Sequence, residues 1–263
     1  MTTSTKQIIP ALFVGHGNPM NAIEETVYAA AWRTIAASIP RPKAILCISA
    51  HWETEGTFVT SMAQPKTIHD FYGFPEELYQ VQYPAPGSPE LAGRVKSLVS
   101  STAVRLDDGY SWGLDHGAWS VLRRMYPDAD IPTVQLSLDR TQHARFHYDL
   151  GSELKALREE GVLIVGSGNI VHNLRMLQWE ASEPYPWAAE FDRQAAELIM
   201  AGEHDRLVAY QALGEAARLS IPTNEHYLPL LYVLALQQPG EPVSFFAEGV
   251  PLGSISMRSV RIG

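Results

Sequence analysis

The chain has 263 residues, of which 46% are hydrophobic and 19% charged, a composition typical of a globular protein large enough for an α/β domain. A formal net charge of −9 without a basic cluster argues against nucleic-acid binding. Residues 1–7 lack the apolar segment of a signal peptide, and no apolar run approaches the ~20 residues of a membrane helix. We therefore expect a cytoplasmic protein with no membrane partner.

The periodicity of apolar residues predicts an alternation of strands and helices along the chain. Strands are expected over 8–14, 43–49, 57–62, 104–106, 131–138, 161–165, 243–247 and 254–261. Helices are expected over 21–38, 89–100, 118–126, 141–159, 185–201, 205–212 and 226–236. This alternation predicts an α/β sheet with helices on both faces, and no repeat or change in composition divides residues 1–263 into more than one domain.

Two long segments rich in glycine and aromatic residues, 63–88 and 107–119, interrupt this alternation. Loops of this length in a compact domain are usually functional, often as a lid or as a wall of a binding site. Each carries one histidine, His69 and His116 respectively. Spacing alone assigns neither histidine a role.

Four histidines lie at the ends of predicted elements. Three of them follow a strongly apolar strand: His16, which has a glycine on each side, His51 and His172. The fourth, His226, follows Glu225 at the start of a helix. In open α/β sheets, sites form beyond the carboxyl ends of the strands. Neutral imidazole is a common ligand of zinc and non-haem iron, and one carboxylate would complete a two-histidine, one-carboxylate set. The pattern therefore predicts a metal site.

Other polar candidates have simpler explanations. His143, His147 and His204 fall on or beside predicted helices among polar neighbours, so we expect surface histidines. Cys47, the single cysteine, excludes an intrachain disulfide and reads as a small buried core residue. Segment 166–169 (GSGN) could cradle a phosphate, but it lacks the spacing of a nucleotide-binding loop.

Several motifs together carry a resemblance to a known family. They are 15–20 (GHGNPM), 49–52 (SAHW), 113–119 (GLDHGAW), 168–173 (GNIVHN) and 225–230 (EHYLPL). In this order they resemble the 4,5-DOPA extradiol dioxygenases, members of the class III, LigB-like ring-cleavage enzymes. The resemblance spans nearly the whole chain, from the first predicted strand to the helix after Glu225.

The resemblance implies a single LigB-like α/β domain with a central mixed sheet flanked by helices. The implied activity is oxygen-dependent opening of a catechol ring, that of L-DOPA or a related catechol, to a semialdehyde. Fe(II) is the expected metal, although bacterial members can carry Zn(II). By motif, His16, His51 and His226 match metal ligands, and His172 matches an acid–base residue close enough to the metal to be a fourth ligand. His116 matches a catalytic residue on the substrate side.

Some points stay open in the sequence. Glu225 and His226 are adjacent, and the wider LigB-like class uses a glutamate as third ligand, whereas the closer motif favours His226. A site closed by four histidines would suit structural zinc, because catalysis needs an open coordination position. The sequence is compatible with a homo-oligomer and does not fix the number of subunits.

Aromatic residues are candidates for the substrate wall. Trp52 and Tyr72, with Phe71 and Trp119, lie near the motif histidines in the sequence, but plain packing explains any one of them equally well. Two other functions use the same residues: a zinc hydrolase that generates hydroxide, and a non-catalytic protein that binds a metal or a small aromatic molecule.

Overall fold

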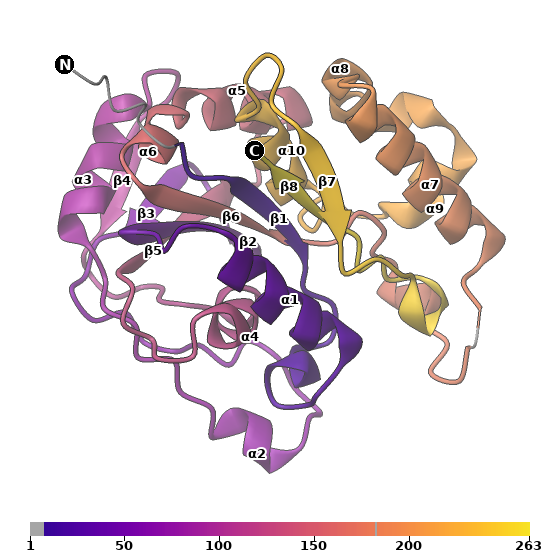
Figure 1. The fold of residues 1–263 in the computed structure, drawn as a ribbon, viewed down its shortest axis with the longest axis horizontal. Helices are drawn as coiled ribbons and strands as arrows, with labels where there is room; N and C mark the ends of the chain where they lie inside the picture. The colour runs from indigo at the N-terminus through magenta and orange to yellow at the C-terminus, as the bar shows by residue number, and fades with distance from the viewer. Residues whose placement is uncertain (1–7, 182) are drawn as a thin grey trace.

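A computed structural model describes residues 8–181 and 183–263; residues 1–7, expected to be polar and free of a signal peptide, lie outside the described part. Among the described residues, eight strands form one mixed sheet in the order β4-β3-β5-β2-β6-β1-β8-β7 (Figure 1). The strands are β1 (Ala11–Gly15), β2 (Ala44–Thr54), β3 (Thr57–Thr60), β4 (Val104–Asp107), β5 (Thr133–Asp139), β6 (Val162–Gly168), β7 (Val243–Phe246) and β8 (Ser259–Ile262). The single domain and the mixed sheet confirm the predicted fold class.

Alternating side chains of the central strands feed two hydrophobic cores, one on each face of the sheet. On β1, Leu12 and Val14 join the core beneath α1 and α4, whereas Ala11 and Phe13 join the core beneath α3, α5 and α10. Successive strand residues point to opposite faces, so an unbroken apolar strand can supply both cores. The two groups of helices lie on opposite sides of the sheet in Figure 1.

The helices complete the architecture in chain order. They are α1 (Val27–Ser38), α2 (Glu76–Tyr79), α3 (Pro89–Leu98), α4 (His116–Met125), α5 (Ala144–Glu153), α6 (Ala156–Glu159), α7 (Pro186–Met200), α8 (His204–Val208), α9 (Glu215–Ser220) and α10 (Leu228–Ala235). Short 3-10 helices are η1 (Pro19–Ala22), η2 (Leu174–Met176), η3 (Tyr210–Leu213) and η4 (Pro251–Gly253). No helix in the described ranges is long and apolar enough to span a membrane.

Most predicted elements are present, and the main differences concern where they end. Strand β2 continues past the predicted end at 49, through His51 to Thr54, because it pairs with β5 again after a register shift between Ile48 and Glu53. The helix predicted over 21–38 begins only at Val27, since Thr26 caps it by accepting a hydrogen bond from the Ala29 N–H.

The sheet brings three distant parts of the chain to one edge. Strands β1, β6 and β2 are parallel neighbours, with Val14 opposite Ser167 and Ser49 opposite Ser167. Parallel strands end at the same edge of a sheet, and that edge is where sites of α/β proteins form. The segments that carry His16 and His51 therefore meet there.

The prediction that His147 is a surface residue is wrong. Its side chain on α5 is fully buried against α10, and Nδ1 lies 3.0 Å from the Tyr232 hydroxyl. Burial is the main cause that lowers its pKa to about 4, so the ring is neutral at pH 7. His204 is partly buried with Nδ1 3.0 Å from the Tyr148 hydroxyl, whereas His143 is exposed as predicted and Cys47 is buried as predicted.

Arg158 ties the start of the sheet to its last segments. Its fully buried guanidinium donates to the Ile9 carbonyl at 2.8 Å, to the Leu236 carbonyl at 2.9 Å and to the carboxylate of Glu241. A buried cation is tolerated only when its donors are satisfied, as they are here.

Replacing Arg158 by methionine should cost about 3–5 kcal/mol of unfolding free energy, because it leaves the Glu241 carboxylate without its paired cation and two carbonyl groups without this donor. Urea unfolding followed by circular dichroism measures the loss. Arg94→Met is the matched control: Arg94 forms an exposed ion pair with Glu160, and its loss should be much smaller. Equal losses in the two variants would contradict the role given to Arg158.

Candidate metal centre

His16 sits directly after β1 and has one ring nitrogen fixed by its surroundings. The chain turns at Gly17, whose φ of 55° is a conformation that glycine adopts without strain. Nδ1 of His16 lies 3.0 Å from Oγ of Ser167, and that hydroxyl donates its own proton to the Gly117 carbonyl at 2.6 Å. Ser167 must therefore accept from His16, which puts the proton on Nδ1 and leaves a lone pair on Nε2.

The Nε2 atom of His51 faces the Nε2 atom of His16. The two nitrogens are 3.2 Å apart, and both rings are largely withdrawn from solvent. Two nitrogens bound to one metal ion at about 2.1 Å, at angles of about 90–109°, are about 3.0–3.4 Å apart. The separation is thus what a metal ion between the two rings requires.

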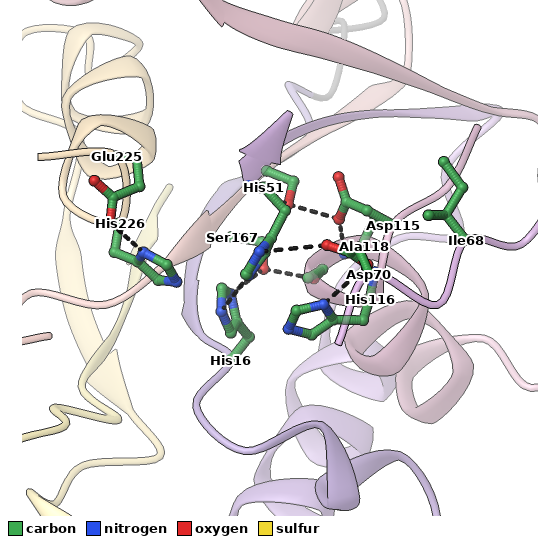
Figure 2. A network of polar contacts seen from close by, with 12 residues as sticks. His16, His51, Ile68, Asp70, Asp115, His116, Ala118, Ser167, Glu225 and His226 are labelled. Atoms are coloured by element: carbon green, nitrogen blue, oxygen red, sulfur yellow. Dashed lines mark hydrogen bonds and ion pairs between the residues drawn. The ribbon is translucent and has the colours of Figure 1, made fainter. Parts of the chain in front are cut away.

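His226 approaches from the segment before α10. Gly168 permits this approach, because a Cβ atom there would lie 2.1 Å from the His226 carbonyl oxygen. Nδ1 of His226 lies 3.0 Å from Oε1 of Glu225, and Figure 2 shows the other ring nitrogen directed toward His16, with Glu225 behind the ring. A carboxylate can only accept, so the Nε2 lone pair of His226 is free.

His172 packs face to face on His226. The two ring centres are 3.4 Å apart and the planes differ by 8°. Its backbone N–H donates to the Ser220 carbonyl at 2.9 Å, and a β-bridge joins it to Ile255. The predicted fourth histidine thus lies beside the other three, in a parallel plane.

His116 begins α4, where the carboxylate of Asp115 caps the helix by accepting from the Ala118 N–H at 3.1 Å. The His116 side chain is 6% exposed, and its ring centre lies 3.9 Å from that of His51. It therefore belongs to the cluster, although the sequence placed it in a loop.

Asp70 is a site residue that the sequence did not identify. It lies in segment 63–88, with Oδ1 3.0 Å from Nδ1 of His116 and Oδ2 3.4 Å from Nδ1 of His51. Burial raises the pKa of Asp70, but its contacts with the two histidines outweigh burial and lower that pKa below its ordinary value. Neither periodicity nor motif spacing identifies Asp70 as a site residue. The one indication in the sequence was that it lies in the long loop 63–88.

Four histidines of the cluster, His16, His51, His172 and His226, are neutral at pH 7. Burial is the largest cause that lowers the pKa values of His16, His51 and His226 well below 6.5, and neighbouring histidines lower them further. Burial, followed by the nearness of a second ionisable ring, His116, lowers the pKa of His172 to about 4. Neutral imidazole is the form that binds a metal ion.

Ligand atoms gather in two groups within this cluster. Atoms of His16, His51 and His116 lie within 4.8 Å of one another, and so do atoms of His172, Glu225 and His226. The rings of His226 and His16 are 5.2 Å apart, which joins the two groups into one site. Its donors are nitrogens with two carboxylates behind them, a set suited to zinc, iron or copper.

The aromatic candidates are placed very differently. Phe71 packs edge-on against His116, with ring centres 5.5 Å apart. Trp52 is 3% exposed and stacks on Trp112, and Trp119 is fully buried with Nε1 donating to the Ile68 carbonyl, so packing explains both. Tyr72 is 92% exposed, and its geometry gives no support to a substrate contact.

Segment 166–169 is part of this site. Gly166 to Gly168 lie within β6, and Ser167 is fully buried with its hydroxyl engaged by His16 and Gly117. The segment is therefore mainly an interior strand and not an open loop that could cradle a phosphate.

The sequence matches a known enzyme family over residues 10–243, described as the catalytic LigB subunit of aromatic ring-opening dioxygenase. The chain belongs to this family. It is therefore an enzyme of the LigB type, as the motif histidines predicted.

Relatives of this LigB-family chain carry a common name. The 4,5-DOPA dioxygenase extradiol of Escherichia coli (strain K12) is 51% identical over 273 residues, spanning 100% of both chains. A protein of the same name from Beta vulgaris is 40% identical over 86% of each chain. The crystal structure of an uncharacterized protein from Escherichia coli K12 superposes with a TM-score of 0.85, at 46% identity, over 97% of this chain and 100% of that one.

Replacing Ser167 by alanine should weaken Zn(II) binding by about 10–100-fold, because His16 loses the acceptor that keeps its Nε2 free. Competition with a chromogenic chelator measures the affinity. The control is Ser137→Ala, which removes a buried serine of β5 whose hydroxyl accepts from the Thr54 hydroxyl and from the Phe58 N–H of β3. That variant should keep the wild-type affinity; a loss in both variants would mean that any buried serine of the sheet matters equally.

Proposed function

We propose that the protein is a metal-dependent extradiol dioxygenase that inserts both atoms of O₂ into the ring of L-DOPA or a related catechol, giving a ring-opened semialdehyde. The observation that carries the proposal is the convergence of the His16 and His51 Nε2 atoms at 3.2 Å, beside His226. The names of the relatives, 4,5-DOPA dioxygenase extradiol, support the choice of substrate.

The proposed ligands are His16, His51 and His226. Three imidazoles bound to one ion through Nε2 at about 2.1 Å have ring centres about 4.6–5.3 Å apart. The observed separations are 5.0, 5.2 and 5.0 Å for this set. His116, whose nitrogens are also near, fits less well, because its ring centre lies 3.9 Å from His51 and 5.8 Å from His16.

Glu225 is better assigned behind the metal than on it. Its carboxylate holds Nδ1 of His226 at 3.0 Å and also accepts from the Thr223 hydroxyl at 3.0 Å. A carboxylate behind a ligating histidine fixes the tautomer and raises the basicity of the ring. This arrangement supports His226, and not the adjacent Glu225, as the proposed third ligand.

We assign His172 as a proton acceptor and not as a fourth ligand. An ion in the plane of the His226 ring lies well outside the parallel plane of His172, 3.4 Å away, so the lone pairs of the two rings do not meet at one point. A neutral ring beside the site can take the proton of a catechol hydroxyl and return it to the product. Three ligands leave coordination positions open, as catalysis requires.

His116 is assigned to the substrate side. Asp70 faces its Nδ1, which leaves Nε2 to accept a hydrogen bond from a catechol hydroxyl. Phe71, packed edge-on against His116, is the aromatic residue placed to wall the ring.

The metal when bound would act as a Lewis acid that lowers the proton affinity of the catechol oxygens and holds the reactants together. Fe(II) is the proposed active metal, and Zn(II) is the metal expected to compete for the same nitrogens. The cytoplasmic location remains a prediction of the sequence.

The test is oxygen uptake by metal-free protein reconstituted with Fe(II) or Zn(II) and given L-DOPA. We expect uptake and a yellow product with Fe(II) in air, and none under anaerobic conditions. Uptake should fail with Zn(II). No oxygen uptake with L-DOPA or any of several simple catechols would refute the dioxygenase, and oxygen-independent turnover with zinc would favour the hydrolase.

His172→Gln should lower kcat by about 10²–10⁴-fold at saturating Fe(II), because a general acid–base contributes that much. The iron content should stay at the wild-type level, since His172 is not a proposed ligand. His143→Gln is the control, because His143 is exposed and lies at the start of α5. Loss of iron from the His172 variant would instead make His172 a ligand.

A further inference from the structure

One carboxylate serves two histidines at once. Asp70 places Oδ1 3.0 Å from Nδ1 of His116 and Oδ2 3.4 Å from Nδ1 of His51, and Oδ1 also accepts from the backbone N–H of His116 at 2.9 Å. The contact between Oδ1 and Nδ1 of His116 is a close approach and not a hydrogen bond of good geometry, so the carboxylate acts on that ring mainly through its charge. Figure 2 shows Asp70 between the two rings and α4.

The segment that carries Asp70 is anchored without the help of its carboxylate. Ile68 donates its N–H to the Leu114 carbonyl at 2.7 Å, Leu114 donates to the Lys66 carbonyl at 2.9 Å, and Trp119 Nε1 donates to the Ile68 carbonyl at 2.7 Å. These bonds fix the backbone two residues before Asp70. The loop therefore does not depend on the Asp70 carboxylate alone, and its bond to the His116 N–H need not be its only role.

We infer that Asp70 is a positioning residue that sets the protonated nitrogen of a metal ligand, His51, and of the substrate-side histidine, His116, at the same time. The inference rests on the proposed function. A carboxylate has no proton to donate, so a ring nitrogen beside it must carry the hydrogen. Both rings then turn unprotonated Nε2 atoms toward the site, one to the metal and the other to the substrate.

This arrangement couples metal binding to substrate orientation through one loop. Each of the other two proposed ligands has a hydrogen-bond partner of its own at Nδ1: Ser167 for His16 and Glu225 for His226. Asp70 alone among these three partners also contacts His116. Its removal should therefore damage two properties, whereas removal of Ser167 or Glu225 acts through the metal ligand.

Asp70→Asn tests the inference with little change in shape. An amide has no charge and offers one oxygen and one NH2 group. It can accept from the Nδ1–H of only one histidine, so the other ring must change tautomer, and the ring that keeps its tautomer loses the attraction of the carboxylate and is held less firmly. Glu77→Gln removes a carboxylate from an exposed position of the same segment and is the matched control. Thermal unfolding checks that each variant folds, and Asp70→Ala replaces Asp70→Asn if that variant does not.

The first readout needs no turnover. Two-bond ¹H–¹⁵N spectra of the Zn(II)-loaded protein report which nitrogen of each histidine carries the proton. We expect Nδ1–H on both His51 and His116 in the wild type and in Glu77→Gln. In Asp70→Asn one of the two should lose this state, and Zn(II) affinity should fall by about 10–100-fold. Unchanged tautomers and affinity would overturn the inference.

The second readout is turnover of L-DOPA at saturating Fe(II), where weaker metal binding no longer limits the rate. We expect kcat of Asp70→Asn to remain about 10–100-fold below wild type, because His116 is misoriented. In the His116→Gln background, Asp70→Asn should lower kcat further by less than twofold. If kcat of Asp70→Asn returned to the wild-type value with excess iron, Asp70 would act on His51 alone, and the dual role would be overturned.

The two hypotheses fail in different ways. If the wild type opens no catechol ring, the proposed function fails, but the tautomers and the zinc affinity still test Asp70. If the wild type is active and Asp70→Asn matches Glu77→Gln in every measurement, only the role of Asp70 is refuted.

Discussion

The approach of two imidazole nitrogens to 3.2 Å, Nε2 of His16 and Nε2 of His51, is the constraint on which the rest of the site depends. Two unprotonated nitrogens repel at this distance unless a proton or a metal ion lies between them. The rings come from different strands, so only a rigid sheet can hold them there. Strands β1, β6 and β2 supply that rigidity by parallel pairing, with β6 between the other two.

Behind each proposed ligand lies an oxygen that fixes the ring. Ser167 of β6 accepts from His16, Asp70 of the long loop faces His51, and Glu225 accepts from His226. These partners come from three separate segments of the chain. Orientation of the proposed metal ligands is therefore distributed over the fold, and the loop contributes to it through Asp70. His116 shares this partner, so Asp70 lies between the proposed substrate side and the proposed metal side.

Local sequence patterns predicted the elements well and the contacts between them poorly. Apolar runs located the central strands because each supplies two cores, and glycine beside His16 predicted the turn that follows β1. His147 was assigned to the surface because its sequence neighbours are polar, yet it packs against Tyr232, 85 positions away in the chain. Asp70 was missed for the same reason: both histidines that it faces are distant in sequence.

The sequence by itself determined the α/β class, the LigB family and the histidines at the strand ends, because apolar periodicity and short motifs are properties of neighbouring residues. Only the tertiary structure decided three relations between side chains. Glu225 lies against Nδ1 of His226, His172 stacks face to face on His226, and Asp70 contacts both His51 and His116. These are relations of direction between side chains on separate segments. They are set by strand register and loop path, which no local pattern encodes.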